Sequence, residues 1–193
     1  MEPVRSFIAI ELPDELKLRL TQLETELKRD EPPGVKWVSP ESIHLTLKFL
    51  GNIDAGRIEA ITRAMEESAQ GIAPFRLRAS GLGVFPNLKR AQVAWVGING
   101  EVDRLSRLQK QLESNLARLG FTPESRAFTP HLTLARLKNY ASPDERQSFG
   151  RLIASREFTA GNIEVVAINL MKSQLTRSGA IYSRLSSARL EGK

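Results

Sequence analysis

The chain contains two histidines, and each of them begins the same tetrapeptide. His44 opens HLTL within SIHLTLKFLG, and His131 opens HLTL within TPHLTLARLK. In a shuffled chain of this composition, the second histidine would be followed by the same three residues with a chance on the order of one in a thousand. Coincidence therefore accounts poorly for the repetition, and these two motifs are the first candidates for chemistry.

Side chains alternate along a β-strand, so each motif separates two kinds of residue. His44 and Thr46 lie on one face and the leucines on the other, and His131 and Thr133 share a face in the second copy. The imidazole and the hydroxyl then stand roughly 7 Å apart along each strand. If the two strands meet, two imidazoles and two hydroxyls converge on one cleft.

Such a group of side chains suits phosphate ester chemistry. Imidazole titrates near neutral pH, so one copy can take a proton from the nucleophile while the other gives a proton to the leaving oxygen. Threonine hydroxyls can donate hydrogen bonds to the non-bridging phosphate oxygens. The motifs therefore predict metal-free acid–base catalysis at a phosphate, with no cofactor.

The two motifs are also compatible with a packing role, a metal site or a binding module. A single His-x-Thr in a strand is more often a packing or surface detail, although its repetition argues against a packing role here. A zinc site is poorly served by two histidines without cysteine and without a carboxylate recurring inside the motifs. An RNA-binding module without turnover stays possible, but arginine and lysine would serve binding at least as well as histidine.

The composition limits the class of protein. With 193 residues, 41% hydrophobic and 26% charged, the chain has enough apolar material for a globular core. The absence of cysteine excludes disulfides, thiol nucleophiles and cysteine metal sites, and it is compatible with a reducing compartment. The net charge of +6 favours a polyanionic partner such as RNA or DNA, although many of the cations lie on helical segments where they would simply be solvated.

The sequence carries no sign of a targeting or membrane segment. MEPVRSFIAIEL lacks the basic start and long apolar run of a signal peptide. No stretch approaches the roughly 18 continuous apolar residues that a membrane span needs. We expect a soluble cytoplasmic monomer with no membrane partner.

The elements around the two motifs also recur, at an offset of 131 − 44 = 87 residues. Strands RSFIAIEL and AQVAWVGI are each followed by an amphipathic helix, about 14–28 and about 101–119. Each HLTL strand precedes another helix, one from about Asp54 and one capped by Ser142 and Pro143. The segments FRLRASGLGVF, REFTAGNIEVVAINLMKSQL and AIYSRLSS supply further strands. Each half reads strand, helix, HLTL strand, helix, strand.

No Gly/Ser linker separates the halves, which are roughly 1–90 and 91–193. We therefore predict a single bilobed α+β domain spanning residues 1–193, with pseudo-two-fold symmetry. Its strands are mostly amphipathic and interrupted by helices, which favours two mostly antiparallel sheets with helices on their outer faces and a central cleft.

The chain resembles the two-histidine phosphoesterase superfamily, which is defined by paired His-x-Thr-x motifs. More closely it is similar to the bacterial and archaeal RNA 2′,3′-cyclic phosphodiesterases, also called 2′-5′ RNA ligases. The likeness runs nearly end to end, through RSFIAIELP, HLTLKFLG, FPNLKRAQVAWVGI, PHLTLARLK and SQLTRSGAIYSRL. The resemblance implies a bilobed fold with a cleft, hydrolysis of RNA 2′,3′-cyclic phosphate ends to 2′-phosphomonoesters, and reversible ATP-independent joining of RNA ends, such as tRNA halves, through a 2′-5′ bond.

The resemblance also implies roles for individual residues. His44 would be the proton donor to the departing 3′-oxygen, and His131 the proton acceptor that activates water. Thr46 and Thr133 would hold the phosphate, and Arg136 would supply positive charge to it. The two motifs are identical, so the residues themselves leave donor and acceptor undecided.

Simple alternation makes a separate prediction for the residues that follow each motif. It places Arg136 on the leucine face, so this side chain needs a bulge, a strand end or a long reach to enter the cleft. It places Lys48 beside the cleft as a solvated lysine, and Phe49 in the core. The flanking residues of the resemblance are Arg5, Arg90, Ser173 and Tyr182, each of which would serve equally as a surface or packing residue.

Overall fold

The computed structural model describes residues 2–193 and contains nine strands and four α-helices within them. The strands are β1 Val4–Ile10, β2 Val35–Trp37, β3 Leu45–Ile53, β4 Phe75–Phe85, β5 Val93–Gly100, β6 His131–Leu137, β7 Thr159–Val165, β8 Ala167–Thr176 and β9 Gly179–Arg189. The helices are α1 Asp14–Leu27, α2 Ile58–Ala69, α3 Val102–Ala117 and α4 Pro143–Ala154. Short 3-10 turns join several of these elements.

The strands form two sheets, one in the order β3-β1-β8-β9 and the other in the order β2-β6-β5-β4-β7. Every strand pair in both sheets is antiparallel. The predicted α+β class with two antiparallel sheets is confirmed. Each HLTL strand lies beside the first strand of its own half, β3 next to β1 and β6 next to β5.

The helices form where leucines recur at helical spacing. One stripe on α1 and one on α3 are buried against the sheets, and they consist of Leu16, Leu20, Leu23 and Leu27, and of Leu105, Leu108, Leu112 and Leu116. The start of α4 is a capping box, in which Ser142 Oγ accepts from the Glu145 amide and the Glu145 carboxylate accepts from the Ser142 amide.

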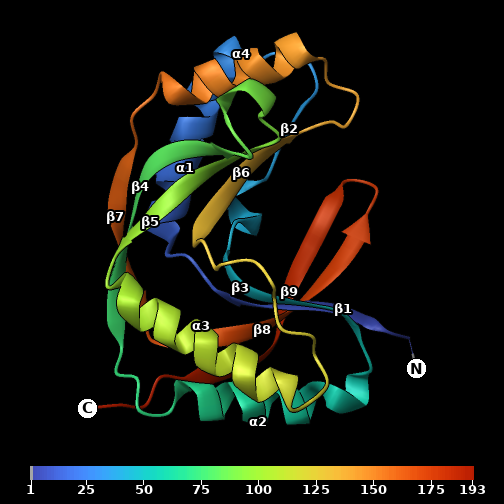
Figure 1. Cartoon of the computed structure of the whole chain (residues 1–193), viewed down its shortest axis with the longest axis vertical. Coiled ribbons are helices and arrows are strands. Elements are labelled where there is room, and N and C mark those ends of the chain that lie inside the picture. The colour runs from blue at the N-terminus through green and yellow to red at the C-terminus, as the bar shows by residue number, and fades with distance from the viewer. Residues whose placement is uncertain (1) are drawn as a thin grey trace.

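The two lobes do not correspond to the two halves of the sequence. Strand β4 of the first half pairs with β5 of the second, and β8 of the second half pairs with β1 of the first. The helices cross in the same way: α1 and α4 both lie on the five-stranded sheet, α1 against β7 and α4 against β4, while α3 packs with α2 on the four-stranded sheet (Figure 1). Each lobe therefore contains elements of both halves, and one continuous cluster of buried apolar side chains runs through both lobes.

Both HLTL strands contain a β-bulge at the same point of the repeat. In β3 the pairing with β1 steps from Ala9 opposite Thr46 to Ile8 opposite Lys48, which leaves Leu47 as the extra residue. In β6 the pairing with β5 steps from Thr133 to Ala135 and leaves Leu134 unpaired, and 134 − 47 = 87 is again the repeat offset. One extra residue reverses which face the following side chains occupy.

Candidate active site

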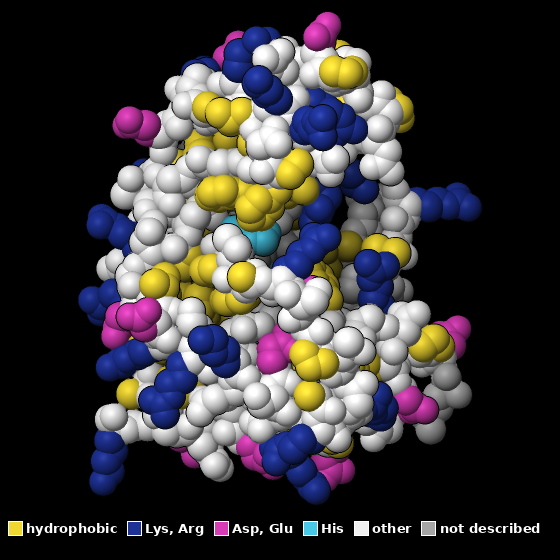
Figure 2. All heavy atoms as spheres, viewed as in Figure 1, with side chains coloured by type: hydrophobic (Ala, Val, Ile, Leu, Met, Phe, Trp, Pro, Cys, Tyr) yellow, Lys and Arg dark blue, Asp and Glu magenta, His cyan; other side chains and the backbone are white. Residues whose placement is uncertain are grey.

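A cleft lies between the two sheets, and the residues predicted from the motifs meet there. Its two adjoining cavities, of about 570 and 690 Å³, are both lined by His44, Thr46, Thr133 and Arg136. His131 lines the larger cavity. Figure 2 shows a histidine side chain inside the hollow between the lobes, with lysine or arginine side chains beside it.

The buried leucines of each strand position the two histidines on the opposite, cleft-facing side. His131 is the first residue of β6 and pairs with Gly97 of β5, whereas His44 stands immediately before the first residue of β3. Behind them, the leucines of both motifs are buried: Leu45, Leu47, Leu132 and Leu134. Burial of these four side chains fixes the orientation of each strand and turns its polar face to the cleft.

Both imidazoles are oriented by the same local hydrogen bond. His44 Nδ1 lies 3.0 Å from the Ser42 carbonyl oxygen, and His131 Nδ1 lies 2.7 Å from that of Thr129. A carbonyl oxygen only accepts, so each Nδ1 carries a hydrogen and donates it. Nε2 is then the nitrogen of each ring that can exchange a proton with a substrate. Sequence reasoning missed these partners because a backbone carbonyl leaves no trace in residue type.

Aromatic rings pack edge-on against each histidine. The His44 ring centroid lies 5.7 Å from that of Phe7 and 5.3 Å from that of Tyr182, and the His131 centroid lies 5.0 Å from that of Phe85. These neighbours limit rotation of the imidazoles about their side-chain bonds. Phe7 and Phe85 were not among the residues singled out from the sequence, where they read as ordinary strand aromatics.

Burial affects the proton affinity of His44. Removal from water lowers the pKa of His44 below its ordinary value of 6.5, because the charged imidazolium loses solvation. The hydrogen bond to the Ser42 carbonyl and the negative charge of Glu11 act in the opposite direction, and the positive charge of Lys17 lowers the pKa further. In the free protein His44 is therefore biased toward its neutral form.

The bulge in β6 decides the position of Arg136. Simple alternation places this residue on the leucine face, but the extra residue Leu134 reverses the order and Arg136 lines both cavities. The bulge considered from the sequence is the route by which the guanidinium reaches the cleft.

The equivalent bulge makes the prediction for Phe49 wrong. Phe49 is 73% exposed, lines both cavities and lies with its ring centroid 6.2 Å from that of Phe7. Alternation placed it in the core because no bulge was assumed at Leu47. Phe49 and Arg136 occupy the same place in the two repeats, since 136 − 49 = 87.

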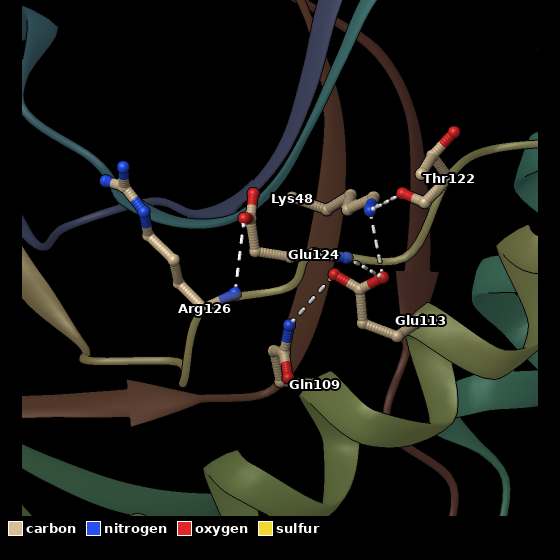
Figure 3. Close-up of polar contacts among 6 residues, drawn as sticks. All are labelled: Lys48, Gln109, Glu113, Thr122, Glu124 and Arg126. Carbon is tan, nitrogen blue, oxygen red and sulfur yellow. Dashed lines mark hydrogen bonds and ion pairs between the residues drawn. The ribbon is translucent and has the colours of Figure 1, made fainter.

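The prediction of a solvated lysine at position 48 is also wrong, for the same reason. Lys48 is only 8% exposed and turns away from solvent toward α3 (Figure 3). Its Nζ donates to the Glu113 carboxylate at 2.8 Å and to the Thr122 carbonyl at 2.7 Å. Glu113 accepts further from the Gln109 amide at 3.2 Å. Through these hydrogen bonds, Lys48 connects β3 with α3 and with the loop around Thr122 that precedes β6.

The remaining flanking residues divide into two groups. Arg5, Ser173 and Tyr182 line the 570 Å³ cavity. Arg90 lies in the 3-10 turn Leu88–Arg90, is exposed, and lines neither cavity.

Two further properties of residues 2–193 bear on the class of protein. Within this range, no group of three or more His, Cys, Asp or Glu side chains is placed to hold a metal ion. None of the helices described by the structure has the length and apolar character to cross a membrane.

Several known proteins are similar to this chain over most of its length. An RNA 2′,3′-cyclic phosphodiesterase of Methanothermobacter thermautotrophicus is 34% identical over 97% of this chain and 99% of its own length. A protein of the same name from Aquifex aeolicus is 40% identical over 77% of this chain and 78% of its own. The crystal structure of E. coli LigT complexed with 3′-AMP superposes with a TM-score of 0.75 at 26% identity, covering 98% of this chain and 99% of that one.

The family match itself reflects the two halves of the chain. The model of the family described as LigT like Phosphoesterase matches residues 10–95 and, a second time, residues 96–182. Each match contains one HLTL motif. Since the two matches together cover most of the sequence, this chain belongs to the LigT like phosphoesterase family.

Proposed function

We propose that this chain hydrolyses RNA 2′,3′-cyclic phosphate ends to 2′-phosphomonoesters. The observation that carries the proposal is the pair of imidazoles, each with Nδ1 engaged by a backbone carbonyl and Nε2 left for chemistry, on one cleft with two threonines and an arginine. Relatives that match nearly the whole chain are RNA 2′,3′-cyclic phosphodiesterases, and a structural neighbour binds the nucleotide 3′-AMP.

In the proposed reaction the two histidines act on opposite sides of the phosphorus. His131 Nε2 takes a proton from water as the water oxygen bonds to phosphorus. The bond from phosphorus to the 3′-oxygen breaks, and His44 Nε2 gives its proton to that oxygen. The products are a 2′-phosphomonoester and a free 3′-hydroxyl. The assignment of donor and acceptor rests on the family resemblance, because both imidazoles are held by equivalent hydrogen bonds.

The other cleft residues would stabilise the charge on the phosphate. In the proposal the Thr46 and Thr133 hydroxyls donate to the non-bridging oxygens, and Arg136 adds a charge-assisted contact. Binding of the anionic substrate would also change the protonation state of His44. A negative charge beside the imidazole favours its protonated form, so binding raises the pKa that burial lowers in the free protein.

The proposal also covers the cofactor requirement, the cellular location and a second, RNA-joining reaction. The reaction would need neither metal nor cofactor, and the enzyme would act as a cytoplasmic monomer. A related reaction would join RNA ends, such as tRNA halves, through a 2′-5′ bond without ATP, and its reversal would cleave that bond. In joining, the 5′-hydroxyl of the second RNA end takes the place of water, so His131 would accept its proton and His44 would again protonate the departing 3′-oxygen.

Alanine variants of the two histidines test the proposal. His44→Ala and His131→Ala should each reduce hydrolysis of a cyclic-ended oligonucleotide in EDTA by a factor of about 10² to 10⁴, since each removes one proton transfer. The new phosphomonoester is measured by phosphorus NMR. Arg90→Ala, an exposed residue away from both cavities, is the control and should retain wild-type activity.

The outcomes separate hydrolysis by two histidines from binding alone and from metal catalysis. Full activity in either histidine variant, with a wild-type circular dichroism spectrum, contradicts the two-histidine mechanism. Tight binding of cyclic-ended RNA by the wild type without any phosphomonoester would favour the RNA-end-binding module. Activity that is lost in EDTA and restored by zinc would favour the metal site.

A further inference from the structure

Strands β8 and β9 continue beyond their sheet as a free hairpin. Strand β1 pairs with β8 only from Asn169 to Lys172, whereas the pairing of β8 with β9 runs on to Thr176 opposite Gly179. We call residues 173–182 the arm. In the part of the chain that the structure describes, the arm pairs with no third strand. Figure 1 shows this hairpin, coloured red, standing beside the space between the lobes.

The base of the arm belongs to the candidate active site. Ser173 and Tyr182 are opposite each other in the β8–β9 ladder, and both line the 570 Å³ cavity. Tyr182 also packs against His44. Paired residues share a face of a sheet and side chains alternate, so the next residues on the cleft face are Leu175 and Ala180, which are opposite each other. The cleft face thus extends outward along the arm.

The exposed surface of the arm carries two apolar side chains and one cation among polar ones. Leu175 is 66% exposed, and Ile181 on the other face is 57% exposed. Arg177 is exposed at the tip, in a turn that Thr176 closes by donating to the Gly179 carbonyl at 2.6 Å. Residues 167–190 include no aspartate or glutamate. Leu175 lies on the cleft face, next to the cavity-lining Ser173, so its exposed side chain can contact a ligand that extends outward from the cavity.

We propose that the arm binds the RNA strand that leads to the terminal cyclic phosphate. Leu175 packs against the base of a nucleotide upstream of the terminal one, and Arg177 pairs with a backbone phosphate. Proteins bind single-stranded nucleic acid through cations that follow the backbone and through side chains, typically aromatic, that contact the base faces; here Leu175 would supply an aliphatic contact. The inference rests on the proposed function in taking RNA as the partner. It adds a preference for an oligonucleotide over a mononucleotide.

Binding measurements test the arm without depending on turnover. One probe is a 5′-fluorescein oligoribonucleotide that ends in a 2′-phosphate, followed by fluorescence anisotropy. The other is a nucleoside 2′-phosphate, whose Ki is obtained by competition with the first. Both end in the product group of the proposed reaction, but only the oligonucleotide is long enough to reach the arm.

Two substitutions, combined in one variant, remove the proposed contacts. In the double variant Leu175→Ala with Arg177→Ala, the Kd of the oligonucleotide should rise about tenfold, while the Ki of the mononucleotide stays at the wild-type value. The slope of the logarithm of the association constant against the logarithm of salt concentration is negative. Its magnitude should decrease by about 0.7, as expected for the loss of one phosphate contact on a single strand. Arg63→Ala, an exposed arginine on α2, removes the same charge elsewhere and should change neither probe.

A shortened arm gives a second test that does not depend on individual side chains. Replacing residues 175–180 with Asn-Gly joins Gln174 and Ile181, which are directly opposite, through a two-residue turn. The same selective loss of oligonucleotide binding is expected. Equal weakening of both probes, or no weakening of either, in both variants would overturn the role of the arm. Failure of the wild type to hydrolyse a cyclic-ended oligonucleotide would overturn the proposed function instead, and the binding comparison would still decide the arm.

Discussion

At the scale of single residues, His44 shows how the surroundings of a motif change the chemistry of its side chain. Both rings are held through Nδ1 by a carbonyl two residues earlier. His44, however, is enclosed by Phe7 and Tyr182, and this burial lowers its pKa. A proton donor with a lowered pKa is protonated only at a more acidic pH in the free protein, and it needs the substrate's charge to hold its proton near neutrality.

The lowered pKa of His44 gives a prediction for pH dependence. In the free protein, His44 should titrate with a pKa below 6.5, measured from its Hε1 signal by proton NMR. Inorganic phosphate added as a substrate mimic should raise that pKa, because the anion favours the imidazolium. If His44 is the donor, its protonated fraction falls as pH rises, so kcat/KM should decline through that same free-protein pKa.

The assignment of the NMR signal comes from the His131→Asn variant, in which His44 is the only remaining histidine. A His44 pKa above 6.5 in the free protein, or one that phosphate leaves unchanged, would contradict the proposed effect of burial and substrate. A kcat/KM that stays constant from pH 5 to pH 9 would contradict acid–base catalysis by the pair.

At the scale of elements, the paired bulges decide which side chains enter the cleft. Each HLTL strand alternates normally from its histidine to its threonine, and then one extra leucine reverses the order. The bulges bring Phe49 and Arg136 to the polar face, and the one in β3 sends Lys48 to the helix side. The repeat places an aromatic ring in one half where the other half has a guanidinium, so a symmetric backbone carries an asymmetric site.

The buried Lys48–Glu113 pair should be important for stability. Lys48→Met leaves the Glu113 carboxylate without its cation in a poorly hydrated position, so the free energy of unfolding should fall by roughly 3 kcal/mol. Adding Glu113→Leu should recover much of this loss, because the double variant no longer buries an unpaired charge. Urea unfolding followed by circular dichroism measures both values.

An exposed pair between the C-cap of α3 and α2 provides the matched control. Arg118 pairs with Glu67 in contact with solvent, and Arg118→Met should cost about 1 kcal/mol or less. If Lys48→Met and Arg118→Met lower the free energy of unfolding equally, burial does not make the Lys48–Glu113 pair more important for stability than an exposed pair. A double variant less stable than Lys48→Met alone would contradict the attribution of the loss to an unpaired charge.

At the scale of the whole molecule, the exchange of elements between the halves joins the lobes. Strands β4 and β8 each complete the sheet that the other half began, and α1 and α3 likewise cover the sheet of the other half. Neither half can form its sheet alone, because β4 without β5 and β8 without β1 lose their central neighbours.

The exchange predicts a single cooperative unfolding transition for residues 1–193. Trp37 and Trp95 both lie in the five-stranded sheet, so their fluorescence reports one lobe, whereas far-ultraviolet circular dichroism reports both. The two urea curves should coincide, as two-state unfolding requires. A fragment of residues 1–90 should show no cooperative transition. Separate transitions for the two signals would instead indicate two independent domains.

Much of the fold follows from local pattern. The strand segments, the leucine stripes of α1 and α3 and the cap of α4 each depend on residues within a few positions of one another, so their propensities and periodicities are visible in the sequence. The 87-residue repeat likewise marked His44, Thr46, His131 and Thr133 as candidates, since the repetition of a motif around the two histidines needs no structure to be recognised.

Tertiary structure decided the rest, because those features depend on partners distant in the chain. A bulge exists only relative to the strand beside it, so the positions of Lys48, Phe49 and Arg136 follow from register with β1 and β5 and not from alternation. The exchange of β4 and β8 is equally invisible in either half alone. The sequence by itself determined which residues are candidates for the chemistry, and pairing between strands determined which neighbours join them in the cleft.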